Sequence, residues 1–100
     1  MASDRARLHR EGDVILVDGA LDRSAATSLW PQLPGLLEGA MRLDLSGISQ
    51  LDSAGLALLV ETAAQLRARH GEQIAVLGTP PGLEDLRAAY RLSTALDFQA

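Results

Sequence analysis

The residue types that usually carry metal binding or catalysis are scarce in this sequence and do not converge. A metal site needs several histidines, cysteines or carboxylates together. The chain has no cysteine, and its two histidines, His9 and His70, fall in different predicted elements without a second ligand at helical spacing. Nucleophilic catalysis needs a serine beside a histidine base, and Asp52-Ser53 has no histidine predicted nearby. We therefore expect no metal, no cofactor and no enzymatic activity.

Motifs for nucleotides, nucleic acids and membranes are also lacking. The sequence contains neither G-x-x-x-x-G-K-[ST] nor G-x-G-x-x-G, the glycine-rich loops that cradle phosphates, so a nucleotide or small-ligand domain has no support. Nine scattered arginines against thirteen acids give a net charge of −4, which leaves no basic stripe for nucleic acid. No apolar run approaches the ~20 residues that span a bilayer. We expect a cytoplasmic protein that reaches a membrane only through a partner.

One segment stands apart because it begins the clearest amphipathic helix of the sequence. Asp52-Ser53-Ala54-Gly55 leads into the range 53–70, where apolar residues recur at helical spacing. Asp and Ser are favoured helix caps because their side-chain oxygens accept hydrogen bonds from free backbone N–H groups. Capping alone therefore explains this pair of residues without a further function.

The same helix also predicts a surface for a partner. A projection at about 100° per residue gives a core face made of Leu56, Leu59, Val60, Ala63, Leu66 and the stem of Arg67. The outer side of the helix in this projection contains Ala54, Ala57, Leu58, Glu61 and Thr62. Leu58 would then be a large exposed apolar side chain, and the small residues Ala54 and Gly55 would let another backbone approach. We predict a partner-binding surface made of Asp52, Ser53, Ala54, Gly55, Ala57, Leu58 and Glu61.

The elements that must position this surface fit a single α/β domain over residues 1–100. With 100 residues, of which 47% are apolar, the chain can build one core and has no length for a second. The ranges 5–10 and 14–17 predict an antiparallel hairpin, 41–46 predicts a strand followed by a loop at 47–51, and 73–77 predicts a further strand. Two strand–helix–strand crossovers imply parallel pairing. We expect a mixed sheet of four to five strands with helices packed on it.

The first helical segment, Arg23 to Glu38, contains its own breaks. Asp22 or Ser24 can cap its start. Pro31 removes a backbone N–H from the helix, and Pro34-Gly35 follows. We therefore expect a kinked element or two short helices here.

Two aromatic residues are expected in the core. Trp30 is the only tryptophan of a chain with 3% aromatic residues, and a large ring in such a chain most often anchors the core. The last helix, predicted over 83–91, is expected to point Leu83, Leu86, Ala89 and Tyr90 inward.

The residues around the predicted surface resemble a known family. Leu43-Asp44-Leu45-Ser46-Gly47-Ile48 and Leu51-Asp52-Ser53-Ala54-Gly55-Leu56-Ala57-Leu58-Leu59 resemble the signature of STAS domains, the fold of bacterial anti-sigma factor antagonists. Gly19-Ala20-Leu21-Asp22 is similar to the family's G-x-L-D turn after the second strand. The resemblance covers almost the whole chain, including the order of its elements. It implies the STAS fold, and the motif pair is more specific for the fold than for a function.

Within the family, the chain resembles the short STAS subunits of ABC transporters that move phospholipids in Gram-negative envelopes. The shared features are Gly55-Leu56-Ala57-Leu58-Leu59, the pair Leu29-Trp30 and the ending Tyr90-Arg91-Leu92. This resemblance implies a non-catalytic subunit that binds the transporter's ATPase at the cytoplasmic face of the inner membrane and supports its assembly or activity.

Ser53 leaves a second function open. It falls at the family's Ser/Thr position, which antagonists use as the phosphoacceptor and where the transporter subunits usually carry Thr. The alternative is an antagonist whose unmodified Ser53 permits binding to a kinase-type anti-sigma factor. Phosphorylation would add ~−1.5 to −2 charges beside Asp52 and end that binding. Pro31 and Pro34 depart from the smooth first helix expected for the family.

Overall fold

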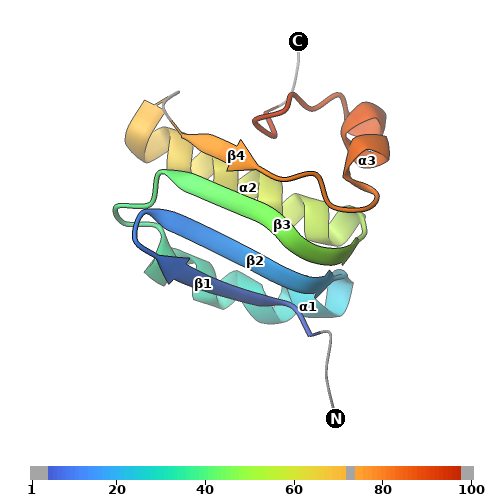
Figure 1. The fold of residues 1–100 in the computed structure, drawn as a ribbon, viewed down its shortest axis with the longest axis horizontal. Coiled ribbons are helices and arrows are strands. Elements are labelled where there is room, and N and C mark those ends of the chain that lie inside the picture. The colour runs from blue at the N-terminus through green and yellow to red at the C-terminus, as the bar shows by residue number, and fades with distance from the viewer. Residues whose placement is uncertain (1–4, 72–73, 98–100) are drawn as a thin grey trace.

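The computed structural model describes residues 5–71 and 74–97, which form one sheet and a layer of helices. The elements in chain order are β1 (Arg7–Glu11), β2 (Val14–Leu21), α1 (Arg23–Leu29), the 3-10 helix η1 (Trp30–Leu36), β3 (Arg42–Leu51), α2 (Ser53–His70), β4 (Ala75–Leu77) and α3 (Leu83–Tyr90). Figure 1 shows α1 and α2 side by side behind the sheet. The opposite face of the sheet carries no helix among the described residues.

The sheet has the order β1-β2-β3-β4 and mixed strand directions. β1 and β2 form an antiparallel hairpin in which Glu11 pairs with Val14, and Gly12 takes a positive φ of 60° in the turn. β2 pairs parallel with β3, and β3 pairs parallel with β4. The predicted α/β class, the opening hairpin and the mixed sheet are therefore confirmed. The start of the predicted last strand, Gln73, lies outside the described residues.

The core lies between the sheet and the helices. β2 alternates strictly, with Ile15, Val17 and Leu21 fully buried on the helix side and half-buried residues between them. Leu43 and Leu45 of β3 continue this buried layer toward β4. Each fully buried Leu, Ile or Val contributes ~1.5–3 kcal/mol relative to an exposed one. The apolar face of the sheet therefore fixes where α2 lies.

The first helical segment breaks where its prolines predict. Asp22 caps α1, since its Oδ1 accepts a hydrogen bond from the Ala25 N–H at 2.9 Å. Pro31 stands at the start of η1, where its missing N–H costs nothing, and Pro34 lies within that tighter helix. The expected division into two short helices is confirmed, and Asp22 rather than Ser24 is the cap.

Two strands run further than the sequence indicates. β2 extends to Leu21 and β3 to Leu51, whereas a loop was expected over 47–51. Gly19 sits within β2 with a φ of 87°, where the register with β3 shifts. A Cβ on Gly47 would overlap the Asp18 carboxylate on the neighbouring strand. These glycines mark irregular pairing inside the strands and not their ends.

Candidate functional site

The start of α2 is held by a carboxylate that joins two helices. Asp52 caps α2, and its Oδ1 accepts a hydrogen bond from the Gly55 N–H at 2.8 Å. Its Oδ2 accepts another from the Arg23 N–H at 3.0 Å, in the first residue of α1. Both helix N-termini carry unpaired N–H groups and a partial positive charge, which a carboxylate satisfies. Asp52 therefore fixes α1 and α2 relative to each other, which confirms its capping role.

Gly55 serves the packing of α2 and not the approach of a partner. It is buried, and a Cβ at this position would overlap the carbonyl oxygen of Leu21 at the end of β2. The missing side chain lets the first turn of α2 lie directly on β2. The expectation that Gly55 offers a close approach to another protein is therefore wrong.

Leu58 is not the exposed apolar side chain that the helical projection predicts. It is 0% exposed, and its neighbour Thr62, also expected on the outer side, is 1% exposed. The Thr62 Oγ1 donates a hydrogen bond to the Leu58 carbonyl at 2.7 Å, which satisfies the buried hydroxyl. Besides the sheet, α2 contacts α1 on one flank and α3 on another, so its buried face is wider than a single stripe. The expectation for Leu58 is wrong for this reason.

The outer side of α2 forms the floor of an open groove of about 550 Å³. Ser53 and Ala57 are exposed in this floor, and Ala54, Val60 and Glu61 are half-buried. Small side chains on consecutive turns leave the helix backbone accessible to another surface. Of the predicted partner-binding residues, the structure thus brings Ser53, Ala54, Ala57 and Glu61 together in one concave surface.

The walls of the groove come from segments that the prediction of the surface did not include. They are formed by Arg23 of α1, Trp30 of η1, and Tyr90 and Leu92 at and after the end of α3. Leu29-Trp30 and Tyr90-Arg91-Leu92 are nevertheless segments that carry the resemblance to phospholipid-transport subunits. The resemblance of these two segments was therefore the one feature of the sequence that could have predicted the walls.

The two aromatic walls contradict the expected core positions. Trp30 is 38% exposed and Tyr90 is 49% exposed. From α1 and η1 the chain buries Ala26, Leu29 and Leu33, whose spacing forms one inward stripe, and Trp30 falls beside that stripe. Ala89 is exposed as well, because residues after α3 take the inner positions. The groove therefore presents two aromatic rings that its own fold covers only in part.

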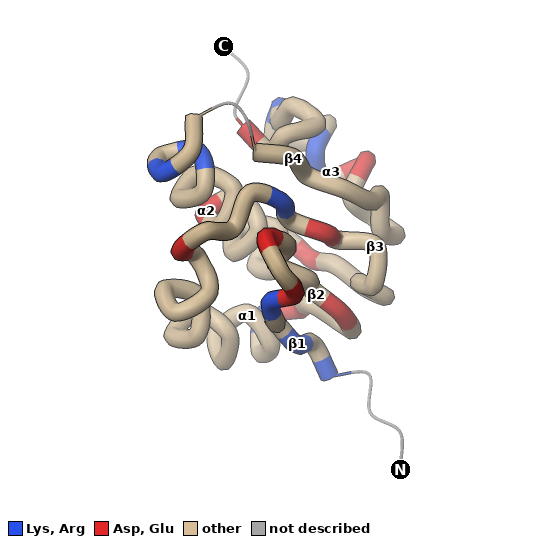
Figure 2. The backbone as a smooth tube through the Cα atoms, turned by 60° about the vertical axis from the view of Figure 1, so that its left-hand side comes forward, with Lys and Arg blue, Asp and Glu red and all other residues tan. Residues whose placement is uncertain are grey.

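Few charges surround the groove. Arg23 and Glu61 are the charged residues of its lining, and the Glu61 Oε2 accepts a hydrogen bond from the Gln65 Nε2 at 2.8 Å. The range 24–37 contains no charged residue, and α1 is mostly tan in Figure 2. An apolar centre with a few polar groups at its border is typical of the core and rim of a protein interface.

The polar residues outside the groove include no candidate metal site in the part of the chain that the structure describes. Within residues 5–71 and 74–97 no three His, Cys, Asp or Glu residues come together to hold a metal ion. Asp44 is engaged locally, since its Oδ1 accepts hydrogen bonds from the Ser46 N–H and Oγ–H at 3.0 and 2.7 Å. None of the helices in that part of the chain has the length and hydropathy needed to cross a membrane.

Comparison with known proteins adds two findings. A family model described as "Mlab, STAS domain" matches residues 5–97. The chain is also 30% identical over 81 residues to a protein of Escherichia coli (strain K12) named "Intermembrane phospholipid transport system binding protein MlaB". The match covers 81% of the chain and 82% of the relative, and a protein of the same name from Shigella flexneri gives the same values.

Proposed function

The chain belongs to the STAS domain family in its MlaB type, and we propose that it is the non-catalytic subunit that binds the ATPase of an inner-membrane ABC phospholipid transporter. The relatives' names, which describe a binding protein of an intermembrane phospholipid transport system, support this role. The partner is an ATPase subunit of the MlaF type. The chain acts on the cytoplasmic face of the inner membrane, where it supports the assembly or activity of the transporter without contacting lipid.

The observation that carries the proposal is the groove over the start of α2. Trp30 and Tyr90 are exposed on its walls, and Ala54 and Ala57 form a flat floor between them. Binding energy in protein interfaces concentrates on a few such aromatic anchors, each worth ~2 kcal/mol or more. An apolar segment of the ATPase seated between the two rings would bury them and contact the small floor residues. Asp52 contributes by holding the two helices and not by direct contact.

Ser53 gives the alternative function a specific basis. Its side chain is exposed at the first residue of α2, in the groove and within reach of a kinase. A phosphate there would place ~−1.5 to −2 charges at the entrance of an apolar surface. In an anti-sigma factor antagonist, that change would release a kinase-type anti-sigma factor.

A direct binding experiment separates the two functions. The purified chain is titrated with the ATPase subunit of the phospholipid transporter from the same organism, and ATP hydrolysis is measured with and without it. Saturable binding of an unmodified chain, with a change in hydrolysis, supports the transporter role. Absence of binding to the ATPase, with binding to a kinase-type anti-sigma factor and ATP-dependent phosphorylation of Ser53, would establish the antagonist instead.

A further inference from the structure

The groove wall formed by Tyr90 and Leu92 receives little support from α3 itself. This helix has eight residues, of which Leu83 at its start is buried and Leu86 is half-buried. Its last three residues are exposed, and helices this short are not stable alone. The position of Tyr90 relative to α2 therefore also depends on the residues that follow.

Those residues close into a compact turn over 92–97, called the C-terminal turn below. The Ser93 N–H donates to the Asp97 carbonyl at 2.7 Å, and the Ser93 Oγ accepts from the backbone N–H groups of Ala95 and Asp97, each at 3.2 Å. Leu92 and Leu96 are 6% and 0% exposed. Leu96 holds a φ of 61°, which non-glycine residues adopt only when their surroundings enforce it.

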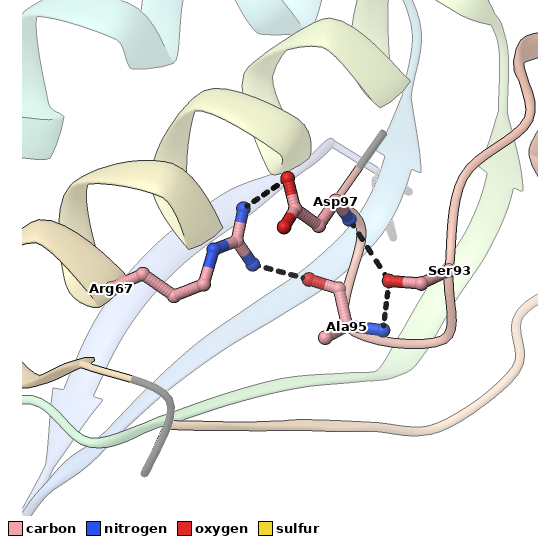
Figure 3. Close-up of polar contacts among 4 residues, drawn as sticks. All are labelled: Arg67, Ser93, Ala95 and Asp97. Carbon is pink, nitrogen blue, oxygen red and sulfur yellow. Dashed lines mark hydrogen bonds and ion pairs between the residues drawn. The ribbon is translucent and has the colours of Figure 1, made fainter. Parts of the chain in front are cut away.

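Arg67 of α2, which lies outside the groove, contacts this turn at two points. The Arg67 Nη1 donates to the Ala95 carbonyl at 2.7 Å, and its Nη2 lies 3.6 Å from the Asp97 Oδ1 (Figure 3). The Arg67 side chain is only 12% exposed, whereas that of Asp97 is 58% exposed. The two terminal nitrogens of the planar guanidinium each face a different group of the turn, in a fixed fork geometry that a lysine ammonium does not reproduce.

We infer that Arg67 is a positioning residue for the partner groove: by clamping the C-terminal turn to α2, it holds Leu92 and Tyr90 opposite Trp30 at the width the partner requires. Arg67 does not line the groove, so its effect passes through the turn. The floor residues of the groove and Arg67 belong to the same helix, so the position of the C-terminal turn is set relative to the floor. The consequence for binding rests on the proposed function, but the effect on the groove can be measured without a partner.

The test compares Arg67→Gln with Arg69→Gln. Arg69 lies in the same turn of α2 and is exposed, so its variant controls for the lost charge. Trp30 is the only tryptophan of the chain and lies in the groove, so its quenching by acrylamide reports how far the other wall shields it from solvent. We expect Arg67→Gln to increase this quenching and to weaken binding of the transporter ATPase about tenfold, with Arg69→Gln within about twofold of the wild type.

Two milder variants keep the test decisive if Arg67→Gln does not fold. Arg67→Lys retains one contact and should restore part of the affinity, and Asp97→Asn removes only the ion pair and should have a smaller effect in the same direction. Unchanged quenching and affinity in the folded variants would overturn the inference. If the wild-type chain does not bind the ATPase, the proposed function fails, while the quenching of Trp30 still decides whether Arg67 sets the groove.

Discussion

The free face of the sheet and the outer side of the helices expose different kinds of side chain to water. The free face of the sheet and the adjoining hairpin turn carry polar side chains that lie near one another: His9 lies 3.7 Å from both Glu11 and Asp18, and Arg42 lies 3.9 Å from Asp13. The strands accordingly show blue and red segments in Figure 2. The helix side presents Trp30 and Tyr90 around a floor of small residues.

The helix side, and not the free face of the sheet, has the features of a surface that binds a partner. Exposed pairs of this kind contribute ~0–1 kcal/mol, so a partner gains little by covering them. Leu77 of β4 is also exposed on this face, at 42%, but single apolar residues are common on a protein surface. Partly exposed aromatic rings around a concave apolar surface contribute favourable free energy when another protein buries them. The comparison therefore predicts that substitutions in the groove affect binding, whereas substitutions on the sheet face do not.

The largest loss of stability is expected for a substitution at Leu58, which is buried beneath the groove floor. Leu58→Asp places a carboxylate in a fully buried position with no cation to pair with it. Such a change costs at least ~4 kcal/mol, so the domain should unfold or melt at much lower denaturant concentration. Urea unfolding followed by circular dichroism measures this loss. A variant with wild-type stability would mean that Leu58 faces outward after all.

The next effect concerns the cap shared by two helices. Asp52→Ala removes the acceptors of the Gly55 and Arg23 N–H groups and should lower the free energy of unfolding by about 2 kcal/mol. Ser53→Ala is the matched control and should cost less than ~0.5 kcal/mol, because Asp52 supplies the cap. Both values come from denaturant titration. Equal losses for the two variants would assign a capping role to Ser53.

A smaller effect on stability but a clear one on binding is expected for Trp30→Ala. Its control is Leu77→Ala, because Leu77 is similarly exposed, at 42%, but lies in β4 outside the groove. Trp30→Ala should weaken binding of the transporter ATPase by about 2 kcal/mol, and Leu77→Ala by less than ~0.5 kcal/mol. Isothermal titration calorimetry gives both affinities. A larger loss for Leu77 would move the interface to the sheet edge.

The smallest effect is expected on the free sheet face. His9→Ala removes two exposed pairs, and solvent screening limits their combined contribution to below ~0.5 kcal/mol. Neither the unfolding midpoint nor the affinity for the ATPase should change measurably. A tenfold weaker complex would show that the charged face also takes part in binding.

Local signals in the sequence were sufficient for most of the fold. The hairpin turn, the break at Pro31 and both bounds of α2 depend on neighbouring residues, and each was predicted correctly. The Asp52 cap belongs to this group as well, although its second contact, to Arg23, is 29 residues away in sequence and could not be foreseen.

The candidate site was harder to predict because side-chain orientation depends on distant elements. Whether Leu58 faces outward depends on the flanking helices of α2, and whether Trp30 is buried depends on how Leu29 and Leu33 meet the core. The helical projection places the stem of Arg67 on the core face, and its side chain is 12% exposed, but its partners could not be foreseen because they belong to a turn 28 residues further along the chain. The sequence therefore located the start of α2 and four residues of the groove floor, Ser53, Ala54, Ala57 and Glu61, but it misplaced Leu58 and Gly55 and did not include the walls.

The most direct test of the account uses one substitution at two places on the same helix. Ala57 and Ala68 are both exposed residues of α2, but only Ala57 lies in the groove. The affinity of the transporter ATPase is measured for the wild type, Ala57→Arg and Ala68→Arg. We expect Ala57→Arg to weaken binding at least about thirtyfold and Ala68→Arg to leave it within about twofold. Equal affinities of the two variants would contradict the assignment of the groove as the binding surface.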